Sequence, residues 1–176
     1  MLCLAILVVA CSTNVHPQPG GPRFDHDDFR FRAPTGWFGR FSTEEPSGRQ
    51  RVAYLANQTL HDDCVPDARL MGQICDWPID GGLRPGGILV TWIVQTCVAR
   101  SCALPDEPLL AIGNRVGVLL PPDGGCEGLN YTDRFAYMVT VSPQRVDVLL
   151  ACARDPSDAT REAFLGFLDG IQWRVP

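Results

Sequence analysis

The stretch GILVTWIVQTC, from Gly87 to Cys97, is the strongest of several strand-like segments in this 176-residue sequence. A strand with one face in water alternates apolar and polar side chains. This run is instead apolar at successive positions, which predicts a strand covered on both faces. We therefore place it centrally in a sheet and arrange the other elements around it.

Shorter segments on either side of this run alternate with the period of two that is typical of strands. They are residues 29–33, 37–42, 51–58 and 115–120. Residues 134–142 and 145–154 predict a hairpin around Ser142-Pro143-Gln144. One face of its second arm is expected to be buried, and its members are Val146, Val148, Leu150 and Cys152.

Apolar residues recur at helical spacing near the end of the chain, at Ala159, Ala163, Phe164, Phe167, Leu168 and Ile171. We expect Asp155 to cap this helix, Pro156 to occupy its first position and Gly170 to end it. Residues 172–175 can then return as a short edge strand, and Pro66–Gln73 can form a second, shorter helix. The predicted fold class is α+β, an antiparallel sheet packed by a C-terminal helix.

Two segments carry a resemblance to a known family. The opening FRFRAPTGW, Phe29–Trp37, has the pattern aromatic-x-aromatic-x-x-Pro-x-Gly-Trp, and the predicted helix runs into FLDGIQW, Phe167–Trp173. Together they resemble the PsbP/Mog1-like domain of many actinobacterial lipoproteins. The resemblance implies an α/β/α sandwich and says little about function.

The N-terminus begins with an apolar run of about ten residues, whereas a membrane-spanning helix needs about 20. Such a run suits a secretion signal. Its end, Val8-Val9-Ala10-Cys11, resembles a bacterial lipobox, which implies that Cys11 becomes the acylated first residue of the mature protein. The alternatives are an ordinary signal peptide or a buried strand, with Cys11 a plain cysteine.

These features divide the chain into three parts. Residues 1–10 are the predicted signal peptide, and residues 11–23 are a lipidated, Pro- and Gly-rich tether. Residues 24–176 are predicted to fold as a single domain. The tether would hold this domain beside a membrane on the extracytoplasmic side of the cell envelope.

Six cysteines remain in the predicted domain, which indicates disulfides in an exported chain. Proximity favours the pairs Cys64–Cys75 and Cys97–Cys102, which leaves Cys126–Cys152. A Cys75–Cys97 or a Cys102–Cys126 bond would fit nearly as well. The absence of a CxxC pair argues against a zinc site.

The tripeptide His-Asp-Asp occurs twice, beginning at His26 and at His61. Its imidazoles and carboxylates could form a mixed metal site if the fold brought them together. Solvated turns explain them better, and we expect neither a metal nor another cofactor. The pairs Glu44-Glu45 and Asp106-Glu107 could serve glycoside cleavage, although acidic pairs in loops are usually only solvated.

No GxSxG, HExxH, P-loop or dinucleotide-binding motif occurs, so we expect no enzymatic activity. The net charge is −5, and arginine supplies every positively charged side chain. Arg30, Arg32, Arg40, Arg49 and Arg51 interleave with acidic residues, which argues against binding nucleic acid.

The first functional hypothesis is therefore a lipid-anchored, non-catalytic module that binds an envelope protein or another envelope component. The second hypothesis is a carrier of a small apolar ligand held between the helix and the sheet. The third is a metal-assisted hydrolase that uses His26 and His61.

Overall fold

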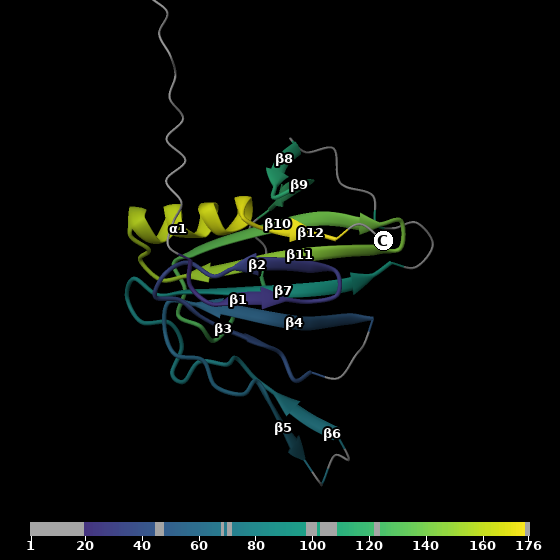
Figure 1. The fold of residues 1–176 in the computed structure, drawn as a ribbon. Helices are drawn as coiled ribbons and strands as arrows, with labels where there is room; N and C mark the ends of the chain where they lie inside the picture. The colour runs from purple at the N-terminus through teal and green to yellow at the C-terminus, as the bar shows by residue number, and fades with distance from the viewer. Residues whose placement is uncertain are drawn as a thin grey trace, which may run out of the picture.

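A seven-stranded antiparallel sheet forms the centre of the molecule, in the order β3-β4-β7-β11-β10-β9-β8 (Figure 1). The computed structural model describes residues 20–44, 48–67, 69, 72–97, 102, 109–121 and 124–174. The strands are β3 (Phe38–Phe41), β4 (Arg49–Ala56), β7 (Ile88–Thr96), β8 (Leu109–Ile112), β9 (Arg115–Leu120), β10 (Asp133–Ser142) and β11 (Arg145–Ala153). The run GILVTWIVQTC thus forms β7, between β4 and β11, which confirms its central position.

Alternate residues of the central strands contribute to two separate cores, one on each face of the sheet. From β7, Val90 and Trp92 enter the first core, whereas Leu89 and Ile93 enter the second. The first core is covered by an α-helix and a small antiparallel sheet, β1-β2-β12. Their bounds are α1 (Asp158–Asp169), β1 (Arg23–Asp25), β2 (Phe29–Arg32) and β12 (Gln172–Trp173). Loop residues, among them Trp77, Leu83 and Leu129, cover the second core.

The antiparallel sheet, the late hairpin and the C-terminal helix match the predicted α+β class. Within the described residues, α1 is the one helix, and it covers a single face of the large sheet. The second helix predicted at Pro66–Gln73 is wrong. This region contains the two-stranded β5-β6 hairpin, β5 (Cys64–Asp67) and β6 (Gly72–Cys75). A disulfide joins its first cross-strand pair, which holds both arms extended.

The start of the helix also differs from the prediction. The N-cap is Ser157, whose side chain accepts a hydrogen bond from the Thr160 N–H at 3.2 Å. Asp155 lies two residues earlier with a φ of 46°, so it belongs to the turn that leaves β11. The end of the helix is as predicted, with Gly170 as its C-cap, and Phe164, Phe167 and Leu168 form the buried stripe.

Besides β5 and β6, two further strands, β1 and β8, were not expected from the sequence. β1 lies where the tether was expected to end, and the chain already pairs with β2 at Gly21, whose N–H donates to the Ala33 carbonyl. β8 is joined to β9 by a tight turn at Gly113-Asn114. Gly113 has a φ of 60°, and any side chain there would collide with the Ile171 carbonyl. A Gly-Asn pair between apolar runs is a hairpin signal that could have revealed β8.

Three disulfides brace the fold, and they are the set that proximity favoured. Cys64–Cys75, Cys97–Cys102 and Cys126–Cys152 have Cα separations of 4.0, 5.5 and 5.8 Å. The third is fully buried in the second core, where Cys152 lies on the predicted buried face of β11. It fastens the loop around Cys126 to the sheet.

Candidate functional site

The two His-Asp-Asp segments lie on opposite faces of the large sheet. The His26 ring stacks on Phe29, a residue of the first core, with 4.7 Å between ring centroids. Asp63 of the other segment instead accepts a hydrogen bond from Tyr54 in the second core, and His61 lies 3.2 Å from Asp80. The sheet therefore separates the two imidazoles. Among the described residues, no group of three or more metal-ligating side chains is assembled, which contradicts the shared metal site.

The acidic pairs offer no alternative catalytic centre in the described part of the chain. The Glu44 carboxylate accepts bonds from the backbone N–H and the Nε of Arg51, at 2.8 and 3.0 Å. This ion pair fastens the chain after β3 to β4. Glu45, Asp106 and Glu107 lie outside the described residues.

A buried ion pair lies in the first core. Asp147 is fully buried and accepts hydrogen bonds from Trp92 Nε1 at 2.8 Å and from two nitrogens of Arg145 at 2.8 and 3.0 Å. Burial raises the pKa of Asp147, although both partners favour its charged form. Arg145 also binds Asp28, so the network fastens the turn between β1 and β2 to the central strands. Its role is structural.

Asp63 forms a second buried network on the opposite face. It accepts bonds from the Ser42 hydroxyl, from the backbone N–H and hydroxyl of Thr43, both at 3.0 Å, and from the Tyr54 hydroxyl at 3.0 Å. Burial alone would raise the pKa of Asp63, but these hydrogen bonds hold it below its usual range. Burial raises the pKa of Tyr54, which therefore remains a donor. The network fixes Cys64, and with it the base of the β5-β6 hairpin.

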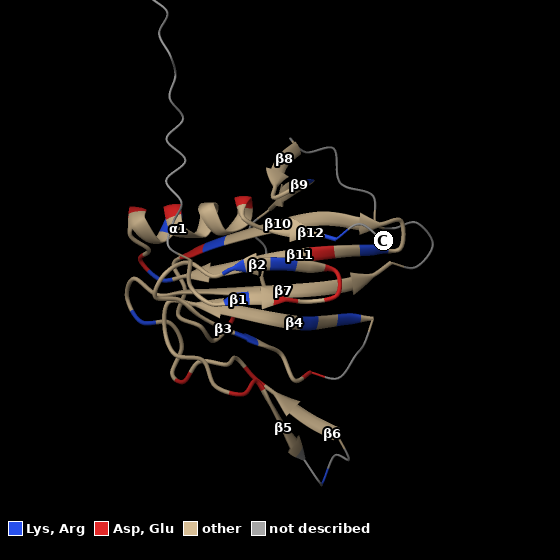
Figure 2. Cartoon of the chain, in the orientation of Figure 1, with Lys and Arg blue, Asp and Glu red and all other residues tan. Residues whose placement is uncertain are grey.

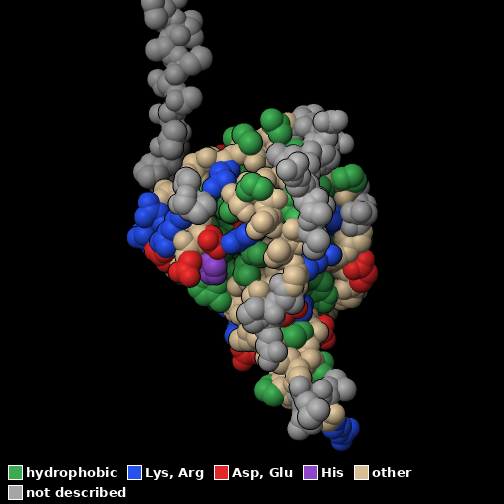
Figure 3. Space-filling view, turned by 90° about the vertical axis from the view of Figure 1, so that its right-hand side faces the viewer, with side chains coloured by type: hydrophobic (Ala, Val, Ile, Leu, Met, Phe, Trp, Pro, Cys, Tyr) green, Lys and Arg blue, Asp and Glu red, His purple; other side chains and the backbone are tan. Residues whose placement is uncertain are grey.

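This hairpin projects from the body of the molecule (Figure 1). Val65 and Ile74 are cross-strand partners on it, yet they are 55% and 49% exposed. Green side chains on the projection are visible in Figure 3, below the main body. Among the described residues, β5 and β6 pair only with each other. The hairpin, which the Cys64–Cys75 disulfide closes at its base, thus exposes the apolar side chains of Val65 and Ile74 to solvent.

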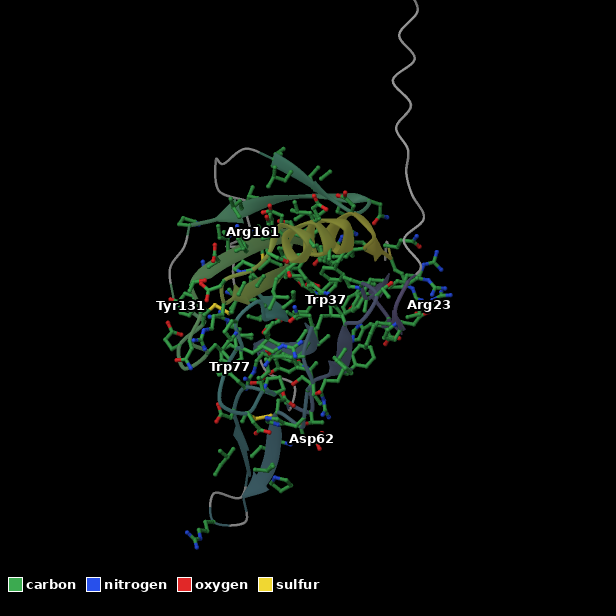
Figure 4. The ribbon with its side chains drawn as sticks, turned by 90° about the vertical axis from the view of Figure 1, so that its left-hand side faces the viewer. Arg23, Trp37, Asp62, Trp77, Tyr131 and Arg161 are labelled. Atoms are coloured by element: carbon green, nitrogen blue, oxygen red, sulfur yellow. A yellow bond between two sulfur atoms is a disulfide. The ribbon has the colours of Figure 1, made fainter. Side chains whose placement is uncertain are left out.

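A second feature lies on the outer side of β1-β2-β12, and we call it the arginine face. In the sequence FRFR of β2, Phe29 and Phe31 point into the core, so Arg30 and Arg32 point to solvent. The members of the face are Arg23, Arg30, Arg32 and Arg174. Figure 2 shows positive charge on β1 and β2, and the sticks in Figure 4 show nitrogen-tipped side chains gathered around Arg23.

A groove of about 450 Å³ lies between this face and the C-terminal end of α1. Three of the four arginines line one side of it, and Gly166 and Gly170 lie on the helix side. Because neither glycine carries a side chain, the guanidinium groups stay accessible along the groove.

A cavity of about 320 Å³ lies on the other face of the large sheet. Thr91, Ile93 and Leu150 line it from the sheet, and Trp77 and Glu127 from the loops. The Thr91 side chain is fully buried, and its hydroxyl has no hydrogen-bond partner in the described part of the chain. A buried hydroxyl without a partner is costly, so a polar group that reached it from the cavity would relieve this cost.

The lipobox-like residues Val8–Cys11 lie outside the described residues. No helix in the described part of the chain is long and apolar enough to cross a membrane. Comparison with known proteins found no matching protein-family model, curated protein or solved structure.

The projecting hairpin, the arginine face and the Thr91 cavity are features that sequence reasoning missed. Only the alternation in FRFR gave a signal for one of them.

Proposed function

We propose that this protein is a lipid-anchored, non-catalytic envelope module that binds a partner protein through the β5-β6 hairpin. The lipobox-like motif ending in Cys11 supports the anchor. The observation that carries the binding function is the exposed pair Val65 and Ile74 on a projecting, disulfide-closed hairpin.

A two-stranded hairpin is at best marginally stable by itself. Here the Cys64–Cys75 disulfide and the hydrogen bonds of Asp63 hold its base. A rigid element loses little conformational entropy when it binds, so it can present apolar side chains at low cost. The occupant that fits Val65 and Ile74 is an envelope protein with an apolar groove that removes both side chains from water.

The test is photo-cross-linking in intact envelopes, with a photoreactive residue placed at position 66, next to Val65 on β5 and opposite Gln73 on β6. We expect a specific adduct that disappears in the double variant Val65→Ser/Ile74→Ser. Leu165→Ser is the matched control, because Leu165 is similarly exposed, at 51%, but lies on α1. An adduct that survives the double variant, or disappears equally in the control, would overturn the hairpin as the binding element.

The anchor has its own test. Cys11→Ala should leave an unacylated or unprocessed precursor, detected by the mass of the intact protein and by its release from membranes. An unchanged mass together with unchanged membrane association would overturn the proposed lipidation.

The Thr91 cavity favours a second candidate function, the binding of a small ligand that has both apolar and polar groups. Arg49, Arg51 and Glu127 line the cavity together with the apolar side chains. Phe164, Phe167 and Leu168 pack into the space between α1 and the large sheet. Native mass spectrometry of gently purified protein should show the bound mass. Thr91→Val keeps the shape and removes the hydroxyl, so it should abolish binding and stabilise the ligand-free protein by about 1 kcal/mol. A destabilised Thr91→Val protein with unchanged ligand content would contradict this function.

A further inference from the structure

The arginine face concentrates positive charge on an acidic protein. Four arginines lie on it, whereas the 176-residue sequence has a net charge of −5. Few acidic side chains neutralise these arginines. Asp25 forms ion pairs with Arg23 and Arg174. Arg30 donates a hydrogen bond to the neutral side chain of Gln172. The face therefore keeps an excess of positive charge.

The register of the small sheet brings two of these charges directly together. Arg23 and Arg32 are cross-strand partners, and like charges at such positions repel each other. Within the described residues, no side chain forms an ion pair with Arg32. An anion bound between the two guanidinium groups would turn this repulsion into attraction.

The arginine face lies where the chain approaches its proposed anchor. The backbone of Gly21 pairs with Ala33, next to Arg32, so the chain enters the fold at this face. Eight residues, Ser12–Pro19, separate the lipidated position, Cys11, from Gly20. The nine residue steps from Cys11 to Gly20 can extend to at most about 32 Å. A tether of this length holds the face within a few Debye lengths of the membrane surface.

We propose that the arginine face docks on anionic phospholipid headgroups of the membrane that holds the anchor. This proposal rests on the proposed lipidation of Cys11. Guanidinium groups match phosphate geometry with two parallel hydrogen bonds and keep their charge at any physiological pH. The groove beside Gly166 and Gly170 gives headgroup phosphates access to three of the four arginines.

The experiment maps arginine reactivity in the full-length acylated protein on vesicles. Phenylglyoxal modification is read by mass spectrometry on phosphatidylcholine vesicles with and without about 30% phosphatidylglycerol. We expect Arg23, Arg30 and Arg32 to react at least about fivefold more slowly on the anionic vesicles. Arg69, on the β5-β6 hairpin, should be unaffected. Raising the NaCl concentration from about 0.05 to about 0.5 M should remove the protection.

A charge-matched pair of variants separates docking from general electrostatics. Arg23→Gln/Arg32→Gln should abolish the protection of Arg30, whereas Arg49→Gln/Arg69→Gln should retain it at the same net charge. Equal protection on uncharged vesicles, or retained protection in the first variant, would overturn the proposal. Full protection by soluble glycerol phosphate without anionic lipid would assign the face to a free phosphate compound and also overturn it.

The mass of the protein, measured in the same samples, reports the anchor separately. If Cys11 carries no acyl chains, the proposed anchor fails, and the chain should no longer sediment with uncharged vesicles. The arginines of such a chain would still be protected on anionic vesicles at high lipid concentration. Loss of protection in a chain whose acylation is verified would count against the docking face alone.

Discussion

Asp63 and Asp147 are both buried aspartates, yet their pKa values shift in opposite directions. Burial dominates at Asp147, where the partners of the carboxylate are Arg145 and Trp92. At Asp63 the donors are neutral, but their combined hydrogen bonds outweigh burial. Folding therefore favours the ionised form of Asp63 and disfavours that of Asp147.

The lowered pKa of Asp63 predicts a loss of stability in acid. A carboxyl group with a lower pKa in the folded state contributes stability above its unfolded pKa of about 4, and this contribution disappears as the pH falls. Asp63→Asn should therefore cost about 1–3 kcal/mol at pH 7 and much less at about pH 3. Urea unfolding across this pH range measures the difference. A cost that does not change with pH would contradict the assigned role of the charge.

The ion pair in the first core makes Arg145 more important than its partly exposed position indicates. Arg145→Met leaves Asp147 buried without its charged partner, which should cost about 3–5 kcal/mol. Adding Asp147→Asn removes the stranded charge, so the double variant should be more stable than the single one. Denaturant midpoints at pH 7 compare the stabilities of the two variants. A double variant less stable than Arg145→Met would show that the unpaired charge of Asp147 is not the cause of the loss.

Among the secondary-structure elements, those with regular periodicity could be predicted. β9 has the bounds that the alternation indicated, and β7, β10 and β11 differ from theirs by one residue at some ends. The β5-β6 hairpin could not be predicted in this way, since its strands are short and no periodic pattern marks Cys64–Cys75. Its extended shape depends on the disulfide and on the network of Asp63, which are contacts distant in sequence.

The start of α1 shows how local chemistry can mislead. Asp155 and Ser157 are both good capping residues, and only the backbone geometry distinguishes them. Ser157→Ala should destabilise the protein by about 1 kcal/mol. Asp155→Gly should be neutral or slightly stabilising, because glycine adopts the positive φ of this position without strain. Thermal unfolding of the two variants checks the assignment, and the reverse order of stability would exclude Ser157 as the cap.

At the scale of the whole molecule, the fold places arginines together on one surface, although they interleave with acidic residues in the sequence. Arg30 and Arg32 alternate with phenylalanines and follow three acidic residues, so the sequence indicated a surface of mixed sign. In the structure Asp28 instead binds Arg145, and the arginines meet Arg23 on one sheet face. Apart from the outward alternation of Arg30 and Arg32, the candidate sites could not be foreseen, because each depends on strand register and on which core covers which face.

The arginine face and the hairpin lie in different parts of the molecule, and Arg23 is far from the projecting strands in Figure 4. If the face docks on lipid, the hairpin extends away from the membrane. A fluorophore on a non-natural residue at position 69 should therefore be quenched less by headgroup-attached quenchers than one at position 30. The measurement uses the acylated protein on anionic vesicles. Equal quenching at both positions would reject this orientation.

The three disulfides join cysteines that are consecutive along the folded domain: Cys64 to Cys75, Cys97 to Cys102 and Cys126 to Cys152. No closed loop encloses or crosses another. In a chain that emerges N-terminus first into an oxidising compartment, each thiol meets its native partner as the next cysteine to appear. If the chain is exported as proposed, stepwise oxidation in the order of emergence would yield the native pairing without an exchange of mispaired bonds by an isomerase.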